Sequence, residues 1–196
     1  MRIVFMGTPD FAVGSLQALC ESGKHEILAV VTQPDRPKGR GNKLLQTPVK
    51  EYALAQGLTV YQPQKVKTPE FVELLHELQP ELIVVAAFGQ FLSKEILELP
   101  KYGCINVHAS LLPKYRGAAP IQYAIIKGEK ESGVTIMQMD IGMDTGAMLD
   151  KVVVPIEENT TMGELHYALR EQGAALLLQV IDKIAAGTAV AEPQDN

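Results

Sequence analysis

Residues 82–108, LIVVAAFGQFLSKEILELPKYGCINVH, contain the pattern that decides the fold. Two apolar runs of strand length, at 82–88 and 104–108, flank a short segment that Ser93 can cap as a helix and that ends before Pro100. Strands that are apolar on both faces and that alternate with helices indicate a parallel sheet covered on both sides.

The same alternation extends through the N-terminal half of the chain. Further strand-like runs occupy 2–7, 26–32 and 58–62. Two helix starts between the strands have an N-cap threonine followed by proline at the first helical position. We therefore expect an α/β domain with a doubly wound, mostly parallel sheet and ligands beyond the carboxyl ends of its strands. The two helix starts are Thr47-Pro48 and Thr68-Pro69.

The second half of the chain adds two further strands and a long helix. The strand-like segments at 133–140 and 147–156 are too close together for a helical crossover, so we expect an added antiparallel pair. Thr161 and Glu164 have capping-box spacing at the start of a terminal helix that runs to Gly187.

The composition is that of a globular protein, with 46% hydrophobic and 21% charged residues in a chain of 196. The longest apolar runs are far too short to cross a bilayer, and the first residues lack the pattern of a signal sequence. We therefore expect a cytoplasmic protein without membrane contact. Cys20 and Cys104 lie far apart with no CxxC motif, so we expect buried, reduced thiols and no zinc site.

The net charge of −5 argues against a surface that coats nucleic acid. The stretch 33–50 is an exception, since it holds five cations against the single acid Asp35, among prolines and glycines. We expect a basic, mobile loop there, which is either merely solvated or binds a phosphate-bearing partner. The five cations are Arg36, Lys38, Arg40, Lys43 and Lys50.

An amide and an imidazole stand within the otherwise apolar run at 104–108. Strand side chains alternate between faces, so Asn106 and His108 project from the same face, roughly 7 Å apart. An imidazole can move protons near neutrality and an amide can hold a developing oxyanion, so the pair suits acyl transfer. The alternative is a hydrogen-bonded pair with a structural role only.

The connection MDIGMDTGAM at 139–148 alternates acids with glycines. A calcium loop does not fit, because the third position is Gly142 and no glutamate closes a twelve-residue loop. The segment is either a solvated turn or a loop that presents Asp144 to the pocket, where it could orient or stabilise a protonated His108.

Other candidate residues receive a plain interpretation. His25, His76 and His166 are isolated on expected loop or helix surfaces, and we assign them no function. The methionines of the second half fill gaps in the core or the pocket rather than bind metal.

Four separated stretches resemble the folate-dependent formyltransferases, and together they cover nearly the whole chain. They are INVHASLLPKYRGAAPIQ at 105–122, GVTIMQMDIGMDTGAML at 133–149, GTPDFAV at 7–13 and TQPDRPKGRG at 32–41. The resemblance implies a Rossmann-like formyltransferase fold that uses 10-formyltetrahydrofolate as formyl donor and no metal.

The resemblance also implies roles for individual residues. Asn106, His108 and Asp144 match the catalytic asparagine, histidine and aspartate of the family. The pterin of the family's donor is held largely by main-chain groups, which fits the loop around Phe88 and Gly89. The residues that would border the folate site after the strand are Ser110, Leu111, Leu112 and Pro113.

Within the family, the resemblance is closest to the enzymes that formylate the α-amine of methionyl-initiator tRNA for translation initiation. Arg36, Lys38, Arg40 and Lys43 would then contact the tRNA, with Arg40 reaching toward the acceptor stem. The resemblance further implies a catalytic domain at 1–189, and at 190–196 the start of a linker to a β-barrel domain absent from this chain. We expect a monomer.

Two alternatives remain open on the sequence alone. One is a related folate-dependent formyltransferase or hydrolase that acts on glycinamide ribonucleotide, an amino sugar or water. The other is a folate-binding or RNA-binding module without turnover, although the intact set of Asn106, His108 and Asp144 argues against a pure binder.

Overall fold

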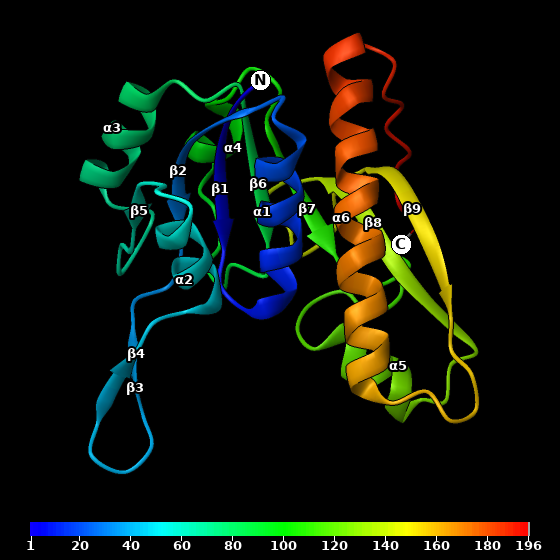
Figure 1. The fold of residues 1–196 in the computed structure, drawn as a ribbon. Coiled ribbons are helices and arrows are strands. Elements are labelled where there is room, and N and C mark those ends of the chain that lie inside the picture. The colour runs from blue at the N-terminus through cyan, green and yellow to red at the C-terminus, as the bar shows by residue number, and fades with distance from the viewer. Residues whose placement is uncertain (196) are drawn as a thin grey trace.

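A seven-stranded sheet organises the chain in the computed structural model, which describes residues 1–195 (Figure 1). The strand order is β5-β2-β1-β6-β7-β8-β9, in which the first five are parallel and β8 and β9 are each antiparallel to the strand before. The predicted α/β class, with a mostly parallel sheet and an added antiparallel pair, is confirmed. The strands are β1 (Arg2–Gly7), β2 (Glu26–Val31), β5 (Val60–Tyr61), β6 (Leu82–Ala86), β7 (Cys104–His108), β8 (Glu131–Gln138) and β9 (Met148–Pro155).

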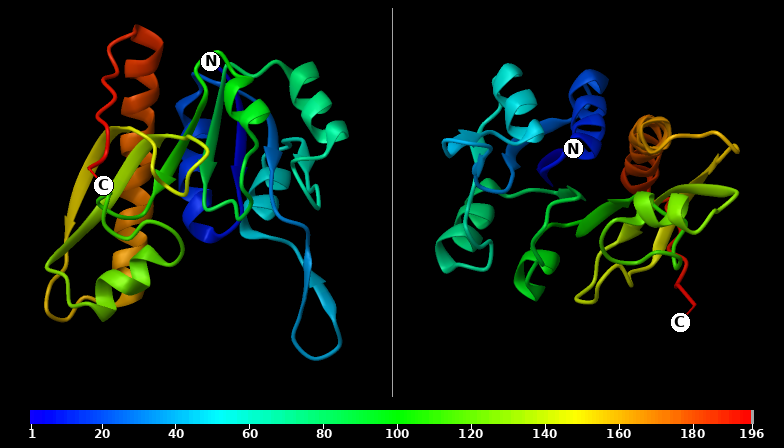
Figure 2. Two further views of the ribbon diagram at one scale, coloured as in Figure 1. Left: turned by 180° about the vertical axis from the view of Figure 1, so that it is seen from behind. Right: turned by 90° about the horizontal axis from the view of Figure 1, so that it is seen from below.

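Helices cover both faces of the sheet, as the right view of Figure 2 shows. Alternate residues of β1 sort between the two layers: Ile3 and Phe5 pack on one side, and Val4 and Met6 pack on the other. The first side is covered by α1 (Asp10–Ser22), α2 (Pro48–Ala55), α5 (Pro120–Ile126) and α6 (Met162–Ala186), and the second by α3 (Pro69–Leu78) and α4 (Lys94–Glu98).

The helices begin where the sequence predicts. The hydroxyls of Thr47 and Thr68 accept hydrogen bonds from backbone N–H groups three residues later, and such a cap typically contributes about 1 kcal/mol. Ser93 and Thr161 cap α4 and α6 in the same way. Within residues 1–195, no helix combines the length and the apolar character needed to cross a membrane.

The basic stretch differs from the predicted mobile loop. Its residues form a short antiparallel ribbon, β3 (Arg36–Lys38) and β4 (Lys43–Leu45), which projects beyond the carboxyl ends of the parallel strands (Figure 1). The chain reverses through Gly39, Gly41 and Asn42, all with positive φ, which glycine and asparagine tolerate best. We call this ribbon, residues 36–45, the basic hairpin.

Two other expectations are corrected. Cys20 is half-buried rather than buried, although Cys104 is fully buried, and both are free thiols. The strand predicted at 82–88 ends at Ala86, because Ala87 takes a positive φ of 47° and the chain leaves the sheet there. The strand predicted at 58–62 is also shorter, since only Val60–Tyr61 pairs with β2.

Candidate active site

Two polar side chains of β7 define the site. Asn106 and His108 are 8% and 7% exposed and line the same cavity, while Ile105 and Val107 pack into the core on the other side of the sheet. The expected shared face of the amide and the imidazole is therefore confirmed, and it follows from the two-residue period of the strand.

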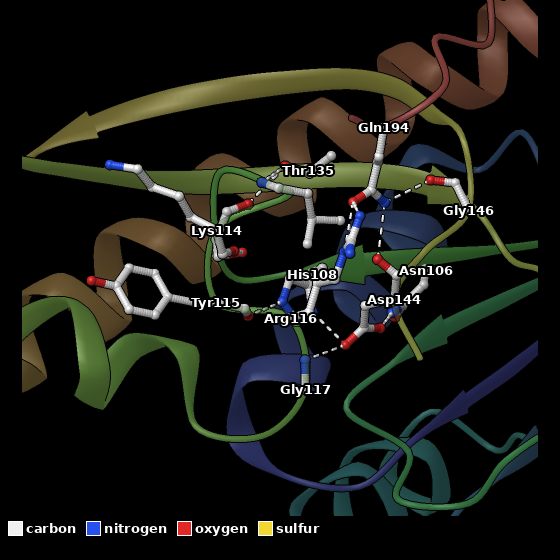
Figure 3. A network of polar contacts seen from close by, with 12 residues as sticks. Asn106, His108, Lys114, Tyr115, Arg116, Gly117, Thr135, Asp144, Gly146 and Gln194 are labelled. Carbon is white, nitrogen blue, oxygen red and sulfur yellow. Dashed lines mark hydrogen bonds and ion pairs between the residues drawn. The ribbon is translucent and has the colours of Figure 1, made fainter. Parts of the chain in front are cut away.

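Asp144 joins this pair through its carboxylate (Figure 3). Its Oδ1 accepts a hydrogen bond from Asn106 Nδ2 at 3.3 Å, and its Oδ2 accepts one from the Gly117 backbone N–H at 2.8 Å. The same Oδ2 lies 3.6 Å from His108 Nδ1. Asp144 is therefore not a solvated turn residue, since the loop between β8 and β9 brings it to both polar residues of β7.

The contact made by Nε2 of His108 determines which ring nitrogen carries a proton when the ring is neutral. Nε2 lies 2.9 Å from the Tyr115 carbonyl oxygen, and because a carbonyl only accepts, Nε2 carries a proton. Nδ1 faces Asp144 at a distance longer than a hydrogen bond. A protonated His108 therefore has one N–H directed toward Asp144 that can also be offered to a substrate atom.

The amide of Asn106 has unused hydrogen-bonding capacity. Its Oδ1 is buried and has no partner among the described residues. A buried polar atom without a partner typically costs about 1–3 kcal/mol, so its presence points to a donor that a ligand supplies. Nδ2 carries two hydrogens, and within residues 1–195 it donates one hydrogen bond, to Asp144.

Backbone strain gathers around these side chains. Ala87, Tyr115, Ala119 and Asp144 all have φ between 47° and 57°, a region that residues with a Cβ rarely adopt. Each such residue costs on the order of 1–3 kcal/mol and persists only where its surroundings hold it. The cluster indicates that the loops around the cavity are shaped for a site rather than for stability.

The cavity has a volume of about 610 Å³. Its walls are largely apolar with a few converging polar groups, which is typical of a small-molecule site. Phe88 and Gly89 line it, and their contact with a folate stays a prediction. Among residues 1–195, no three His, Cys, Asp or Glu side chains gather as metal ligands. Apolar residues that line the cavity include Phe11, Phe91, Met137, Met139, Ile141 and Met143.

Ser110, Leu111, Leu112 and Pro113 do not line this cavity. The Thr135 hydroxyl holds their loop, because it donates to the Ser110 carbonyl at 2.7 Å and accepts from the Leu112 N–H at 3.1 Å. Thr135 pairs with His108 in the sheet register. The loop returns the Tyr115 carbonyl to His108, and a direct folate contact of these four residues stays a prediction.

His166 lines the cavity, so its interpretation as an isolated surface residue is wrong. Its ring contacts Phe11 edge-on, with 6.2 Å between the ring centroids. The contact depends on the packing of α6 against α1, which no local sequence pattern indicates. Thr135 also has a role that the sequence prediction does not include, although a hydroxyl inside the apolar β8 is a local signal of a buried hydrogen bond.

The basic hairpin lies apart from the cavity wall. Arg36, Lys38, Arg40 and Lys43 are exposed, and none forms an ion pair among residues 1–195. The fifth cation of the stretch differs, because Lys50 Nζ lies 2.8 Å from Asp35 at the base of the hairpin.

The fold and the site together define an α/β protein with a small-molecule cavity equipped for proton transfer and oxyanion stabilisation. Residues 1–181 match the Formyl transferase family. The chain therefore belongs to this family.

Curated relatives are similar to the chain over its whole length. It is 57% identical to the methionyl-tRNA formyltransferase of Alkaliphilus metalliredigens over 196 residues, all of this chain and 62% of the relative. It is 58% identical to that of Clostridium botulinum over 189 residues, 96% of this chain and 60% of the relative. The chain thus spans about three fifths of the length of these relatives.

Solved structures share the fold. Glycinamide ribonucleotide transformylase 1 from Symbiobacterium toebii superposes with a TM-score of 0.80 at 20% identity, covering 100% of this chain and 94% of that one. An N-formyltransferase from Helicobacter canadensis gives a TM-score of 0.73 at 25% identity, covering 99% and 67%. The Rossmann-like formyltransferase fold expected from the sequence is confirmed.

The Lys50 ammonium and the Gln62 amide, which both bond to Asp35, hold the pKa of its carboxyl below the usual value. The ion pair therefore stabilises the fold above the unfolded-state pKa of about 3.9, and this contribution is lost as the pH falls through the lower folded-state pKa. Lys50→Met should raise the pKa of Asp35 toward its usual value, measured by NMR titration of the carboxyl carbon. Lys50→Arg, which keeps the charge, should keep most of the depression; an unmoved midpoint in Lys50→Met contradicts the assignment.

Proposed function

We propose that the chain transfers the formyl group of 10-formyltetrahydrofolate to the α-amine of methionine on initiator tRNA, giving N-formylmethionyl-tRNA. The observation that carries this proposal is the meeting of Asn106, His108 and Asp144 in one cavity of a chain that belongs to the Formyl transferase family. The methionyl-tRNA formyltransferases at 57% and 58% identity support the choice of acceptor.

The donor side of the proposal rests on the cavity. A volume of about 610 Å³ with apolar walls suits a flat heterocycle with a few polar edges. Gly89 has a φ of 95°, a backbone conformation that glycine adopts readily and residues with a Cβ rarely adopt, so glycine suits this turn in the cavity wall. The Helicobacter canadensis enzyme was solved with folinic acid, which supports a folate-type donor for this chain.

In the first step of the proposed reaction, the neutral amine attacks the formyl carbon. A carbon–nitrogen bond forms and the formyl oxygen becomes an oxyanion. The free N–H of Asn106 and the Nδ1–H of protonated His108 are the donors that stabilise this charge. Asn106 Oδ1, which has no partner among residues 1–195, accepts a hydrogen bond from the amine and so directs the lone pair of the amine toward the carbon.

In the second step, the bond between the formyl carbon and N10 of the folate breaks. The amine loses one proton and N10 gains one, so the products are tetrahydrofolate and the formylated amine. Asp144, fixed by Asn106 and the Gly117 N–H, relays this proton through water and keeps His108 oriented. No covalent enzyme intermediate is required.

The acceptor side of the proposal rests on the basic hairpin. The hairpin projects from the end of the sheet where the parallel strands finish, as the left view of Figure 2 also shows, and its four cations are exposed. Cations without carboxylate partners are available to phosphates. We assign Arg36, Lys38, Arg40 and Lys43 to contact with tRNA.

The acceptor is tested by release of tetrahydrofolate from 10-formyltetrahydrofolate in three parallel reactions. One contains methionyl-initiator tRNA, one contains glycinamide ribonucleotide and one has no acceptor. We expect release with the tRNA only. Release with the ribonucleotide or with water would instead identify a related transferase or a hydrolase, and silence in all three would indicate a binding module without turnover.

His108→Ala should lower turnover by about 10²–10⁴-fold, because it removes a proton-bearing group from the reacting oxygen. Steady-state kinetics with circular dichroism as a folding check measures this effect. His76→Ala is the matched control, since His76 is exposed on α3, lies 3.4 Å from Glu95 and does not line the cavity. Near-normal activity of a folded His108→Ala would remove His108 from the mechanism.

Arg40→Ala should raise the KM for tRNA while leaving the KM for the folate unchanged, because Arg40 lies on the hairpin and not in the cavity. The slope of log affinity against log salt should become shallower by about 1, the loss of one phosphate contact. Lys67→Ala, an exposed cation before α3, is the control. Equal effects of the two substitutions would mean that the hairpin has no special role.

A further inference from the structure

The chain after α6 returns to the site. Beyond Gly187 it runs back beside β9, where the backbone groups of Glu192 and Met148 exchange two hydrogen bonds of 2.7 and 2.8 Å (Figure 1). This antiparallel bridge brings Gln194 into contact with the loop that carries Asp144. The sequence predicted only the start of a linker in this region.

Gln194 uses its whole amide in this position (Figure 3). Its Nε2 donates to the carbonyl oxygens of Asp144 at 2.9 Å and Gly146 at 2.7 Å. Its Oε1 accepts from Nε and Nη2 of Arg116 at 3.0 and 2.9 Å. A glutamine offers two donors and two lone pairs, so every hydrogen-bonding position of the side chain is filled.

The two segments that Gln194 joins are those that position the site. Arg116 lies between Tyr115, whose carbonyl accepts from His108, and Gly117, whose N–H donates to the Asp144 carboxylate. The opposite end of Gln194 holds the backbone of Asp144 itself. Gln194 therefore links Asp144 to the Arg116–Gly117 segment, whose Gly117 N–H binds the Asp144 carboxylate.

The backbone of Asp144 needs such a restraint. Its φ of 54° is in the left-handed region, which residues with a Cβ leave readily unless their surroundings hold them. The hydrogen bond to its carbonyl oxygen acts on the same residue whose carboxylate must meet Asn106 and His108.

We propose that Gln194 is a positioning residue for Asp144, and that the segment after α6 thereby sets the geometry of the active site. The role rests on the proposed function, because it assumes that Asp144 takes part in formyl transfer. Gln194 lies outside the cavity wall and acts through Asp144 and the Arg116–Gly117 segment.

Gln194→Ala in the full chain should lower kcat by about 10–100-fold, since a displacement of about 1 Å in a reacting group can cost that much. The KM values for folate and tRNA should change less than about twofold, because substrate contacts are unchanged. Gln194→Glu keeps an acceptor for Arg116 but loses both donors to the carbonyls, so it should lose kcat as well. Glu192→Ala is the control, since within the described part of the chain Glu192 forms its hydrogen bonds to Met148 through its backbone alone.

A double-mutant cycle separates positioning from general destabilisation. If Gln194 acts through the Asp144 carboxylate, Gln194→Ala should cause no further loss of kcat in an Asp144→Asn background. Additive losses, or an equal loss in Glu192→Ala, would overturn the proposal.

Hydrogen exchange of the Gly117 amide provides a readout that does not need turnover. Its N–H is bound to the Asp144 carboxylate, so Gln194→Ala should speed its exchange at least tenfold, whatever the acceptor is. Unchanged exchange would overturn the proposal, as would faster exchange with normal kcat in an active enzyme. A wild-type chain that transfers no formyl group would instead contradict the proposed function and leave the exchange test of Gln194 valid.

Discussion

The arrangement of the site depends on the contacts that the carboxylate of Asp144 makes. It meets the amide of Asn106, the backbone N–H of Gly117 and the imidazole of His108, while its side chain is only 17% exposed. A largely buried charge is tolerated only when hydrogen bonds and an opposite charge replace its water. The three contacts provide that replacement: two come from side chains of β7, and the third comes from the backbone of the loop that follows β7.

The topology explains why several segments are needed. β8 runs antiparallel to β7, so it ends beside Cys104 at the start of β7, where the Met139 N–H donates to the Cys104 carbonyl. The next loop must then cross back over the face of β7 to bring Asp144 to Asn106 and His108. Such a loop has no sheet to hold it, and the hydrogen bonds of Asp140 to the Gly142 N–H and Thr145 hydroxyl supply part of the restraint.

Features with a local cause were predictable from the sequence. The helix starts at Thr47 and Thr68 follow from capping chemistry, and the shared face of Asn106 and His108 follows from the period of a strand. Their meeting with Asp144 remained one of two interpretations, because 36 residues separate it from His108 and no spacing rule links a loop to a strand.

Features that depend on tertiary packing could not be predicted in this way. His166 reaches the cavity only because α6 packs against α1, and Gln194 reaches Asp144 only because the chain reverses after Gly187. Both are polar residues without a sequence motif around them, so the local sequence does not distinguish them from polar residues exposed to solvent. The basic stretch was predicted by charge, but its ribbon depends on turn residues that the same composition also allows in a flexible loop.

The basic hairpin combines exposed cations with hydrogen-bonded polar groups at its base. Its exposed cations contribute little to stability, and they remain available to a polyanion. Asp35 below them is tied through Gln62 to the backbone of Gln33, whose side chain accepts from Gln90 in the cavity wall. A continuous set of hydrogen bonds therefore joins the root of the hairpin to the loop that lines the cavity. The root of the hairpin therefore keeps a defined position relative to the cavity.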